Sequence, residues 1–239
     1  MAKRHTIVLW VLAASLTIVA VGAIAVGRGF GRRGSQSPGT SLEQLGDYGR
    51  VPAFVLTERS GRQVGLDDLR GLVWAADFIY TECTESCPTQ SLQLAQLQGE
   101  FEATANFRLV SFTVDPTHDT PDVLRRYAER YAAGPRWWFL TGDTRAIYCL
   151  AREGFRLGVS DPAAPELPAC GQALHLSSTP AWASHGSKGL IMHSARVVLV
   201  DRTASIRAYH LATDTESMSR LRANLRTLLA ERPPTAPAR

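Results

Sequence analysis

The segment Leu72–Tyr80 is a mainly apolar, aromatic-rich run that leads directly into two cysteines, Cys83 and Cys87. A run of this length without polar alternation is typical of a central strand buried on both faces of a sheet. The segment Thr89–Ala103 then places large apolar residues at helical spacing: Leu92, Leu94, Leu97 and Phe101. A buried strand followed by such a helix requires a layered fold, because the helix must cover the sheet.

Strands and helices are expected to alternate along the rest of the chain. The strand-like segments are Phe107–Val114, Trp137–Leu140, Val197–Val200 and Ile206–Tyr209, with a short opening hairpin from Phe54–Thr57 and Gln63–Gly65. The helical segments are Pro121–Ala132 with Thr120 as its cap, Asp143–Glu153 and Thr215–Arg232. Residues 158–189 are rich in Ser, Ala, Pro and Gly and indicate a long surface insertion. The pattern predicts an α/β domain with a central mixed sheet flanked by helices.

No charged residue lies between Thr6 and Gly27, a segment that spans about 33 Å as a helix and is long enough to cross a bilayer. Two interpretations are open: a retained transmembrane anchor, or a signal peptide cleaved near Ala23-Ile24-Ala25. The length of the apolar segment favours the anchor. The Gly-, Ser-, Arg- and Pro-rich stretch that follows is expected to be flexible. The predicted divisions are a membrane anchor at 1–27, a linker at 28–47, a folded domain at 48–232 and a disordered tail at 233–239.

The formal charge of +4 comes from the N-terminal segment rather than from the predicted domain. Five of the 26 basic residues lie within residues 1–33, where there are no acids, and the 22 acidic residues balance the rest. A nearly neutral domain lacks the basic surface typical of nucleic-acid binding, so we expect no nucleic-acid partner.

Cys83 and Cys87 lie where the predicted strand ends and the predicted helix begins. The partial positive charge at a helix N-terminus favours the thiolate, which is both the nucleophile of disulfide exchange and the ligand of soft metals. The spacing lets both sulfurs converge on one ion or close into a disulfide. A purely structural disulfide is disfavoured, because so short a loop restrains little chain entropy. The pair is therefore predicted to be a redox or metal site.

A metal site needs more than two sulfurs, and histidine is a suitable third ligand. The candidates outside the N-terminal segment are His118, His175, His185, His193 and His210. His193 belongs to a strand-like run after the insertion, but spacing alone does not raise it above His185.

Four motifs then occur in order. They are Cys83-x3-Cys87-Pro88 after an apolar strand, TVDPTHDTP at Thr113–Pro121, WFLTG at Trp138–Gly142, and His193-Ser194 leading into Leu199-Val200-Asp201. In these motifs the chain resembles the Sco/SenC family over about residues 48–212. The resemblance implies a thioredoxin-like fold, anchored to a membrane in the bacterial periplasm or the mitochondrial intermembrane space. It further implies copper held by two cysteines and one histidine, for assembly of the binuclear copper centre of cytochrome c oxidase. Carried over by motif, the ligands are Cys83, Cys87 and His193.

The ligand chemistry agrees with that implication, because two thiolates and an imidazole suit Cu(I) and the imidazole also suits Cu(II). We therefore expect a copper chaperone rather than an enzyme, held by a single span in the bacterial inner membrane with its soluble domain in the periplasm. Its expected partner is the cytochrome c oxidase subunit that carries the binuclear copper site. One alternative is a thiol–disulfide reductase that uses Cys83 and Cys87 as a redox-active pair. A cysteine peroxidase is a third interpretation.

Four further expectations concern other polar residues and cysteines. Cys149 and Cys170 either pair with each other, or Cys149 is simply a buried helix residue, which we favour. A carboxylate at Asp115 or Asp119 either orients His193 or, for Asp119, caps the helix that follows, and the cap is favoured. The histidines of the insertion, His175 and His185, are expected to be solvated rather than to bind a second metal. The turn after Asp201 lacks the glycine that is frequent in the family, which is expected to change only a hairpin.

Overall fold

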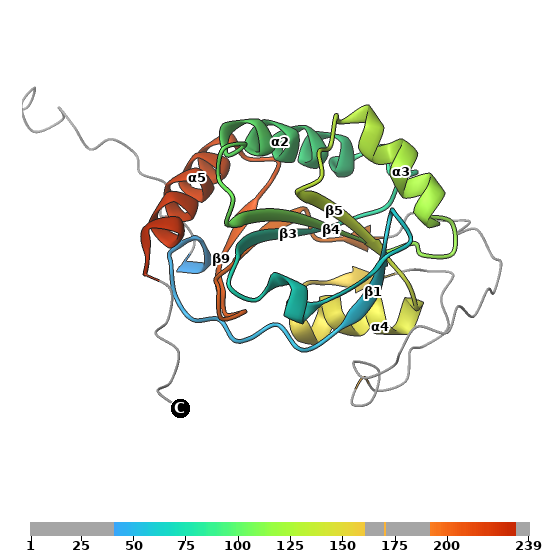
Figure 1. The fold of residues 1–239 in the computed structure, drawn as a ribbon, viewed down its shortest axis with the longest axis horizontal. Helices are drawn as coiled ribbons and strands as arrows, with labels where there is room; N and C mark the ends of the chain where they lie inside the picture. Colours follow the sequence, from blue (N-terminus) through green and yellow to red (C-terminus); the bar gives the residue numbers. More distant parts are fainter. Residues whose placement is uncertain (1–40, 161–169, 171–191, 233–239) are drawn as a thin grey trace, which may run out of the picture. The chain divides into compact units, whose positions relative to one another are not determined.

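The computed structural model describes residues 41–160, 170 and 192–232 (Figure 1). The predicted membrane anchor at 1–27 and the predicted tail at 233–239 lie outside the described residues. Within the described ranges, no helix is both long enough and apolar enough to span a bilayer.

The described residues form a seven-stranded sheet with the strand order β2-β1-β5-β4-β3-β8-β9. The strands are β1 (Val55–Glu58), β2 (Gln63–Gly65), β3 (Val73–Ile79), β4 (Phe107–Thr113), β5 (Trp137–Thr141), β8 (Arg196–Val200) and β9 (Ile206–Leu211). β3 pairs in parallel with β4, and β4 in parallel with β5. The flanking pairs are antiparallel. The sheet is therefore mixed, as predicted, with its parallel strands at the centre.

Helices cover both faces of this sheet. The described helices are α2 (Ser86–Glu100), α3 (Pro121–Arg130), α4 (Thr144–Cys149) and α5 (Thr215–Ala230), with short 3-10 turns at η1 (Ser41–Glu43) and η2 (Leu66–Leu69) and a π-helical turn at η3 (Leu150–Gly154). Figure 1 shows α2, α3 and α5 on one side of the sheet and α4 on the other. The arrangement fits the thioredoxin-like fold that the resemblance implied.

The start of α3 follows the predicted capping pattern. The hydroxyl of Thr120 accepts a hydrogen bond from the N–H of Val123, and Pro121 occupies the first helical position, where no amide donor is needed. Thr120 is thus the cap of α3, and the expectation that Asp119 caps this helix is wrong.

The centre of the sheet is a packed aromatic core. Every residue of β3 is buried, which explains its lack of alternation. Phe78 of β3 stacks on Phe112 of β4 with ring centroids 5.1 Å apart, and Phe155 meets Phe78 edge-on at 5.4 Å. Each such buried side chain contributes about 1.5–3 kcal/mol of transfer free energy. The end of β3 is therefore held by a rigid core.

Residues 41–47, which the sequence analysis placed in the linker, contact the folded domain. Glu43 accepts a hydrogen bond of 2.7 Å from Ser217 Oγ and forms an ion pair with Arg220. Asn224 of α5 donates to the carbonyl of Glu43 at 2.7 Å, and Gly46 N–H donates to the carbonyl of Arg207 at 2.9 Å. The polar composition of residues 41–47 is typical of a linker, but polar groups of this segment form hydrogen bonds with partners on α5 and β9.

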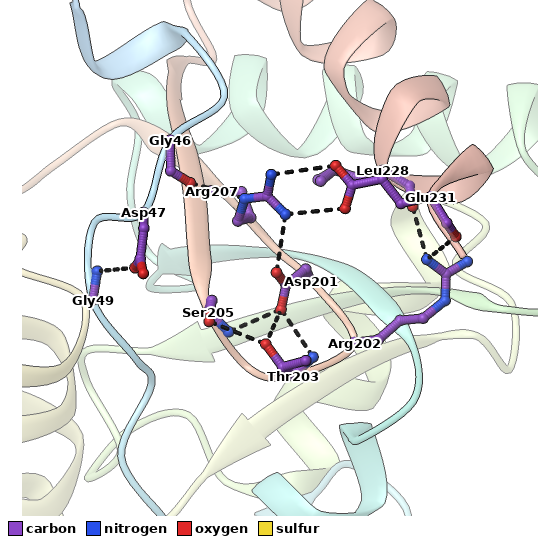
Figure 2. A network of polar contacts seen from close by, with 10 residues as sticks. All are labelled: Gly46, Asp47, Gly49, Asp201, Arg202, Thr203, Ser205, Arg207, Leu228 and Glu231. Atoms are coloured by element: carbon purple, nitrogen blue, oxygen red, sulfur yellow. Dashed lines mark hydrogen bonds and ion pairs between the residues drawn. The ribbon is translucent and has the colours of Figure 1, made fainter. Parts of the chain in front are cut away.

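The turn between β8 and β9 is stabilised without a glycine. Ala204 adopts a left-handed conformation with φ of 65°, and Asp201 Oδ1 accepts hydrogen bonds from the backbone of Thr203 and Ser205. Figure 2 shows how two arginines of this hairpin reach the C-terminal end of α5. Arg202 donates to the carbonyls of Leu228, Leu229 and Glu231, and Arg207 pairs with the carboxylates of Asp201 and Glu231. The contacts of Arg202 satisfy backbone carbonyls at the end of α5, where the helix offers no further N–H donors.

Cys149 and Cys170 form a disulfide with their Cα atoms 5.5 Å apart. Both side chains are buried, and the bond joins the end of α4 to the segment that the sequence assigned to the insertion. Of the two alternatives left open, pairing is observed, and the favoured interpretation of Cys149 as only a buried helix residue is wrong. Spacing did not reveal the bond, because the two cysteines are linked through tertiary contact alone.

Replacing both of these cysteines by alanine is expected to lower the free energy of unfolding by about 3 kcal/mol. The physical reason is that the crosslink spans a sequence separation of 21 and restricts the unfolded chain. Chemical denaturation of the oxidised wild type and of the double variant measures the difference. Equal midpoints and equal slopes for the two proteins would contradict a stabilising role.

Candidate functional site

The cysteine loop, residues 80–85, connects the end of β3 to the start of α2. Cys83 lies in this loop and is half-buried, whereas Cys87 lies in the first turn of α2 and is fully buried. Neither forms a disulfide. α2 begins at Ser86, slightly earlier than the sequence indicated, and Pro88 is tolerated because it lies in the first turn. The predicted strand–loop–helix setting of the pair is observed.

The electrostatic environment of Cys83 favours the thiolate. Burial by itself opposes ionisation, but hydrogen bonds from the Cys87 thiol, from the backbone N–H groups of Cys87 and Glu85, and from the Tyr80 hydroxyl together lower the pKa of the Cys83 thiol. No side chain caps the N-terminus of α2, so its first backbone donors remain directed at the loop. The helix start thus acts as an anion site for one sulfur.

Cys87 and Tyr80 have the opposite tendency. Burial raises the pKa of the Cys87 thiol, and its hydrogen bond to Cys83 and the nearby carboxylate of Asp77 raise it further. Burial and the proximity of Cys83 likewise raise the pKa of the Tyr80 hydroxyl. The half-buried sulfur of Cys83 therefore ionises more readily than the buried sulfur of Cys87, whose thiol donates to it. This asymmetry suits both disulfide exchange and binding of a soft metal.

A buried carboxylate, Asp77, lies in β3 beneath the pair. Its side chain is fully buried and accepts hydrogen bonds from Ser111 Oγ at 2.5 Å and Gln90 Nε2 at 2.8 Å. Trp137 Nε1 donates to Ser111 Oγ at 2.9 Å and completes the network. Burial raises the pKa of Asp77 to about 6. Asp77 was not among the predicted site residues, although a single carboxylate within an otherwise apolar strand was a visible signal.

Asp115 and Asp119 lie in the loop that follows β4, beside the cysteine loop. Asp119 is fully buried and accepts hydrogen bonds from Thr81 N–H and from the hydroxyls of Thr81 and Thr113. Asp115 instead organises its own loop, accepting from Thr117 Oγ1 at 2.8 Å. Asp119 therefore joins two loops rather than capping a helix.

His193 lies in β7 (Met192–His193), which pairs with β6 (Val159–Ser160) in a small antiparallel ladder. Val159 is its backbone partner. The structure describes only the backbone of His193, so its predicted convergence on the cysteines stays a prediction. The predictions for His175 and His185 fall outside the described residues.

The two remaining histidine candidates have local partners. His118 lies near the cysteine loop, with Nε2 at 3.4 Å from Glu82 Oε1. His210 is buried in β9, where Nε2 lies 3.1 Å from Asn224 Nδ2, and burial lowers the pKa of its imidazole to about 4. Among the side chains that the structure describes, no group of three or more His, Cys, Asp or Glu residues is arranged to hold a metal ion.

Comparisons with known proteins agree with the fold. The SCO1/SenC family model matches residues 43–230. The SCO1 protein homolog of Bacillus subtilis is 34% identical over 131 residues, which cover 54% of this chain and 65% of that protein. The match thus spans slightly less than two thirds of that relative.

Two solved structures share the fold. BsSco, described as a member of the Sco family of cytochrome c oxidase assembly proteins with a disulfide switch, superposes with a TM-score of 0.61 at 23% identity, covering 79% of this chain and 98% of that one. The copper-bound ScoI of Bradyrhizobium japonicum gives a TM-score of 0.55 at 20% identity, covering 75% of this chain and 99% of that one.

Alkylation of the reduced protein near neutral pH is expected to modify Cys83 and spare Cys87. The lowered pKa of Cys83 supplies thiolate at a pH where Cys87 is protonated and buried. Tyr80→Phe removes one donor and should shift the pH profile of Cys83 alkylation to higher pH, as measured by peptide mass spectrometry. Tyr48→Phe, which removes a hydroxyl bonded to the Gln44 carbonyl, is the matched control and should leave the profile unchanged. Equal labelling of both cysteines would overturn the assignment.

The Asp77→Asn variant is expected to remove a pH-dependent loss of stability. With a pKa of about 6 in the folded state and about 3.9 unfolded, Asp77 binds more protons when folded, so its stabilising contribution is present below pH 4 and is lost as pH rises to 6. The wild type should therefore lose about 3 kcal/mol relative to the variant between pH 4 and pH 7. Urea denaturation at a series of pH values measures this difference, with the exposed Asp67→Asn as control. A difference that does not change with pH would refute the prediction.

Proposed function

Because the chain belongs to the SCO1/SenC family, we propose that it is a membrane-anchored copper chaperone that matures the binuclear copper site of cytochrome c oxidase. Related Sco proteins have been solved with copper bound, and the Sco family is described as one of cytochrome c oxidase assembly proteins. The observation that carries the proposal for this chain is the pair of reduced thiols at the start of α2, which differ in burial and in the direction of their pKa shifts.

Copper is the cargo of the proposed site, and the donor set suits it. Thiolates are the preferred ligands of Cu(I), and an imidazole from His193 would complete three donors and also accept Cu(II). Cys83 loses its proton more readily than Cys87, and both must be deprotonated when the metal binds. Affinity is thus expected to rise with pH. A three-donor site leaves a position for a ligand of the recipient during transfer.

The proposed location is the bacterial inner membrane, with the domain in the periplasm. The uncharged segment from Thr6 to Gly27 is long enough to act as a single span. The Cys149–Cys170 disulfide supports an oxidising compartment, because such crosslinks rarely persist in the cytosol. The proposed partner is the cytochrome c oxidase subunit that carries the binuclear copper site.

A thiol–disulfide reductase is the second candidate function, and the same asymmetry supports it. An accessible thiolate at Cys83 attacks a partner's disulfide, and Cys87 resolves the mixed disulfide, so that the partner is reduced while Cys83 and Cys87 become oxidised. This function needs no histidine. The role of His193 therefore separates the two candidates.

Titration of the reduced full chain with Cu(I) against a competing chelator is expected to give one bound copper per chain. Cys83→Ser and Cys87→Ser should abolish tight binding, because each removes a thiolate ligand. His193→Ala should weaken binding by about tenfold or more, the scale expected when a metal site loses a supporting group. Oxidation of the pair to a disulfide should abolish binding.

Two controls make this titration specific. The Cys149→Ala/Cys170→Ala variant removes cysteines without removing the proposed thiol ligands and should bind copper, and His175→Ala should match the wild type. If His193→Ala bound copper as tightly as the wild type, the three-ligand proposal would be wrong. If that variant also kept turnover on an oxidised partner peptide, the reductase would become the better candidate.

A further inference from the structure

Asp119 is a fully buried carboxylate in the loop between β4 and α3. Its Oδ2 accepts from Thr81 N–H at 3.1 Å and from Thr113 Oγ1 at 2.5 Å. Its Oδ1 accepts from Thr81 Oγ1 at 2.5 Å and lies 3.1 Å from His118 Nδ1. One carboxylate thus connects the cysteine loop to the end of β4 and to the loop in which Asp119 lies.

The position of these contacts follows from the sheet. The parallel ladder of β3 and β4 ends at the pair Ile79 and Thr113, after which Val114 N–H donates to the carbonyl of Ile79 at 2.7 Å. Thr81 lies just beyond the last rung, where its backbone N–H has no strand partner. Asp119 accepts that N–H, so the carboxylate extends the connection between the two strands past the end of the sheet.

The two cysteines depend differently on this connection. Cys87 is fixed by α2 and is fully buried, whereas Cys83 lies in the loop and its N–H donates to the carbonyl of Tyr80 at 3.2 Å. Thr81 is two residues before Cys83. The placement of the Cys83 sulfur relative to Cys87 is therefore set by a short turn that Asp119 fixes through both donors of Thr81.

A second contact reaches the same turn from outside. His118 Nδ1 lies beside Asp119, and its Nε2 lies 3.4 Å from Glu82 Oε1, the residue between Thr81 and Cys83. Asp119 and His118 together contact two successive residues of the loop. The interior contact is buried and the outer one is half-exposed, so Asp119 provides the more rigid constraint.

We propose that Asp119 is a positioning residue for the cysteine pair, acting through Thr81 to hold Cys83 at the geometry in which both sulfurs converge. The inference deepens the proposed function and rests on Cys83 and Cys87 being its reactive groups. It predicts that loss of Asp119 changes the chemistry of the pair as well as the stability of the domain.

The test compares Asp119→Ala, Asp119→Asn and Thr81→Val with the wild-type full chain. The readouts are the equilibrium between the Cys83–Cys87 dithiol and disulfide against dithiothreitol, the pH profile of Cys83 thiolate absorbance, and Cu(I) affinity. Asp119→Ala should change the disulfide equilibrium constant and the copper affinity by about tenfold or more, the scale of groups that orient metal ligands. Asp119→Asn retains an acceptor for the N–H of Thr81, so its disulfide equilibrium and copper affinity should stay close to those of the wild type. Thr81→Val keeps the N–H and removes the hydroxyl, so its disulfide equilibrium and copper affinity should lie between those of Asp119→Ala and Asp119→Asn.

Asp122→Asn is the matched control, because Asp122 is an exposed carboxylate of α3 that pairs with Arg125. It should match the wild type in every readout. An Asp119→Ala variant with a lower melting temperature but an unchanged disulfide equilibrium and thiolate profile would reduce Asp119 to a structural role and overturn the inference. If Asp119→Ala does not fold, unchanged values in Thr81→Val overturn it equally. A wild type that binds no copper would contradict the proposed function, whereas the disulfide equilibrium tests the inference independently of the metal.

Discussion

The parallel pairing of β3 with β4 is the interaction on which the rest of the domain depends. It lies at the centre of the described sheet, buried on both faces, and it determines where β3 must end. The ladder ends where the N–H of Val114 donates to the carbonyl of Ile79, so the backbone N–H of Thr81 must be satisfied otherwise. The cysteine loop begins at that point, and Asp119 accepts the N–H of Thr81 together with the hydroxyl of Thr113. The reactive pair is thus located where the regular hydrogen bonding of the sheet ends.

Burial then makes the two cysteines chemically unequal. A fully buried thiol pays the full desolvation cost of ionising, whereas a half-buried sulfur that accepts hydrogen bonds from N–H groups at a helix start gains more from those bonds than it loses through burial. The difference between Cys87 and Cys83 therefore follows from one residue being in the helix and the other in the loop. Copper transfer and disulfide exchange would both depend on this difference between the two thiols, since each begins at an accessible thiolate. Only the metal needs a third donor, and for that reason His193 decides between them.

The sequence predicted the elements that local periodicity encodes. The mainly apolar run predicted β3, helical spacing predicted α2, and Thr120 with Pro121 predicted the start of α3. The Sco/SenC resemblance is confirmed by the family match. Three features depend on tertiary contact. The Cys149–Cys170 bond was only the less favoured of two alternatives, and the docking of Glu43 on α5 and the bonding of Asp119 to the cysteine loop were not predicted. Neither the charge pattern nor the residue spacing indicates which distant donor will form a hydrogen bond with a given carboxylate. Asp119 precedes the start of α3, and for that reason the sequence favoured a capping role for it.

The most direct test of the account is the X-ray absorption spectrum of the full chain loaded with Cu(I). The account predicts two sulfur donors from Cys83 and Cys87 together with imidazole scattering that is lost in the His193→Ala variant. A spectrum without sulfur donors, or one whose imidazole scattering survives in that variant, would contradict it.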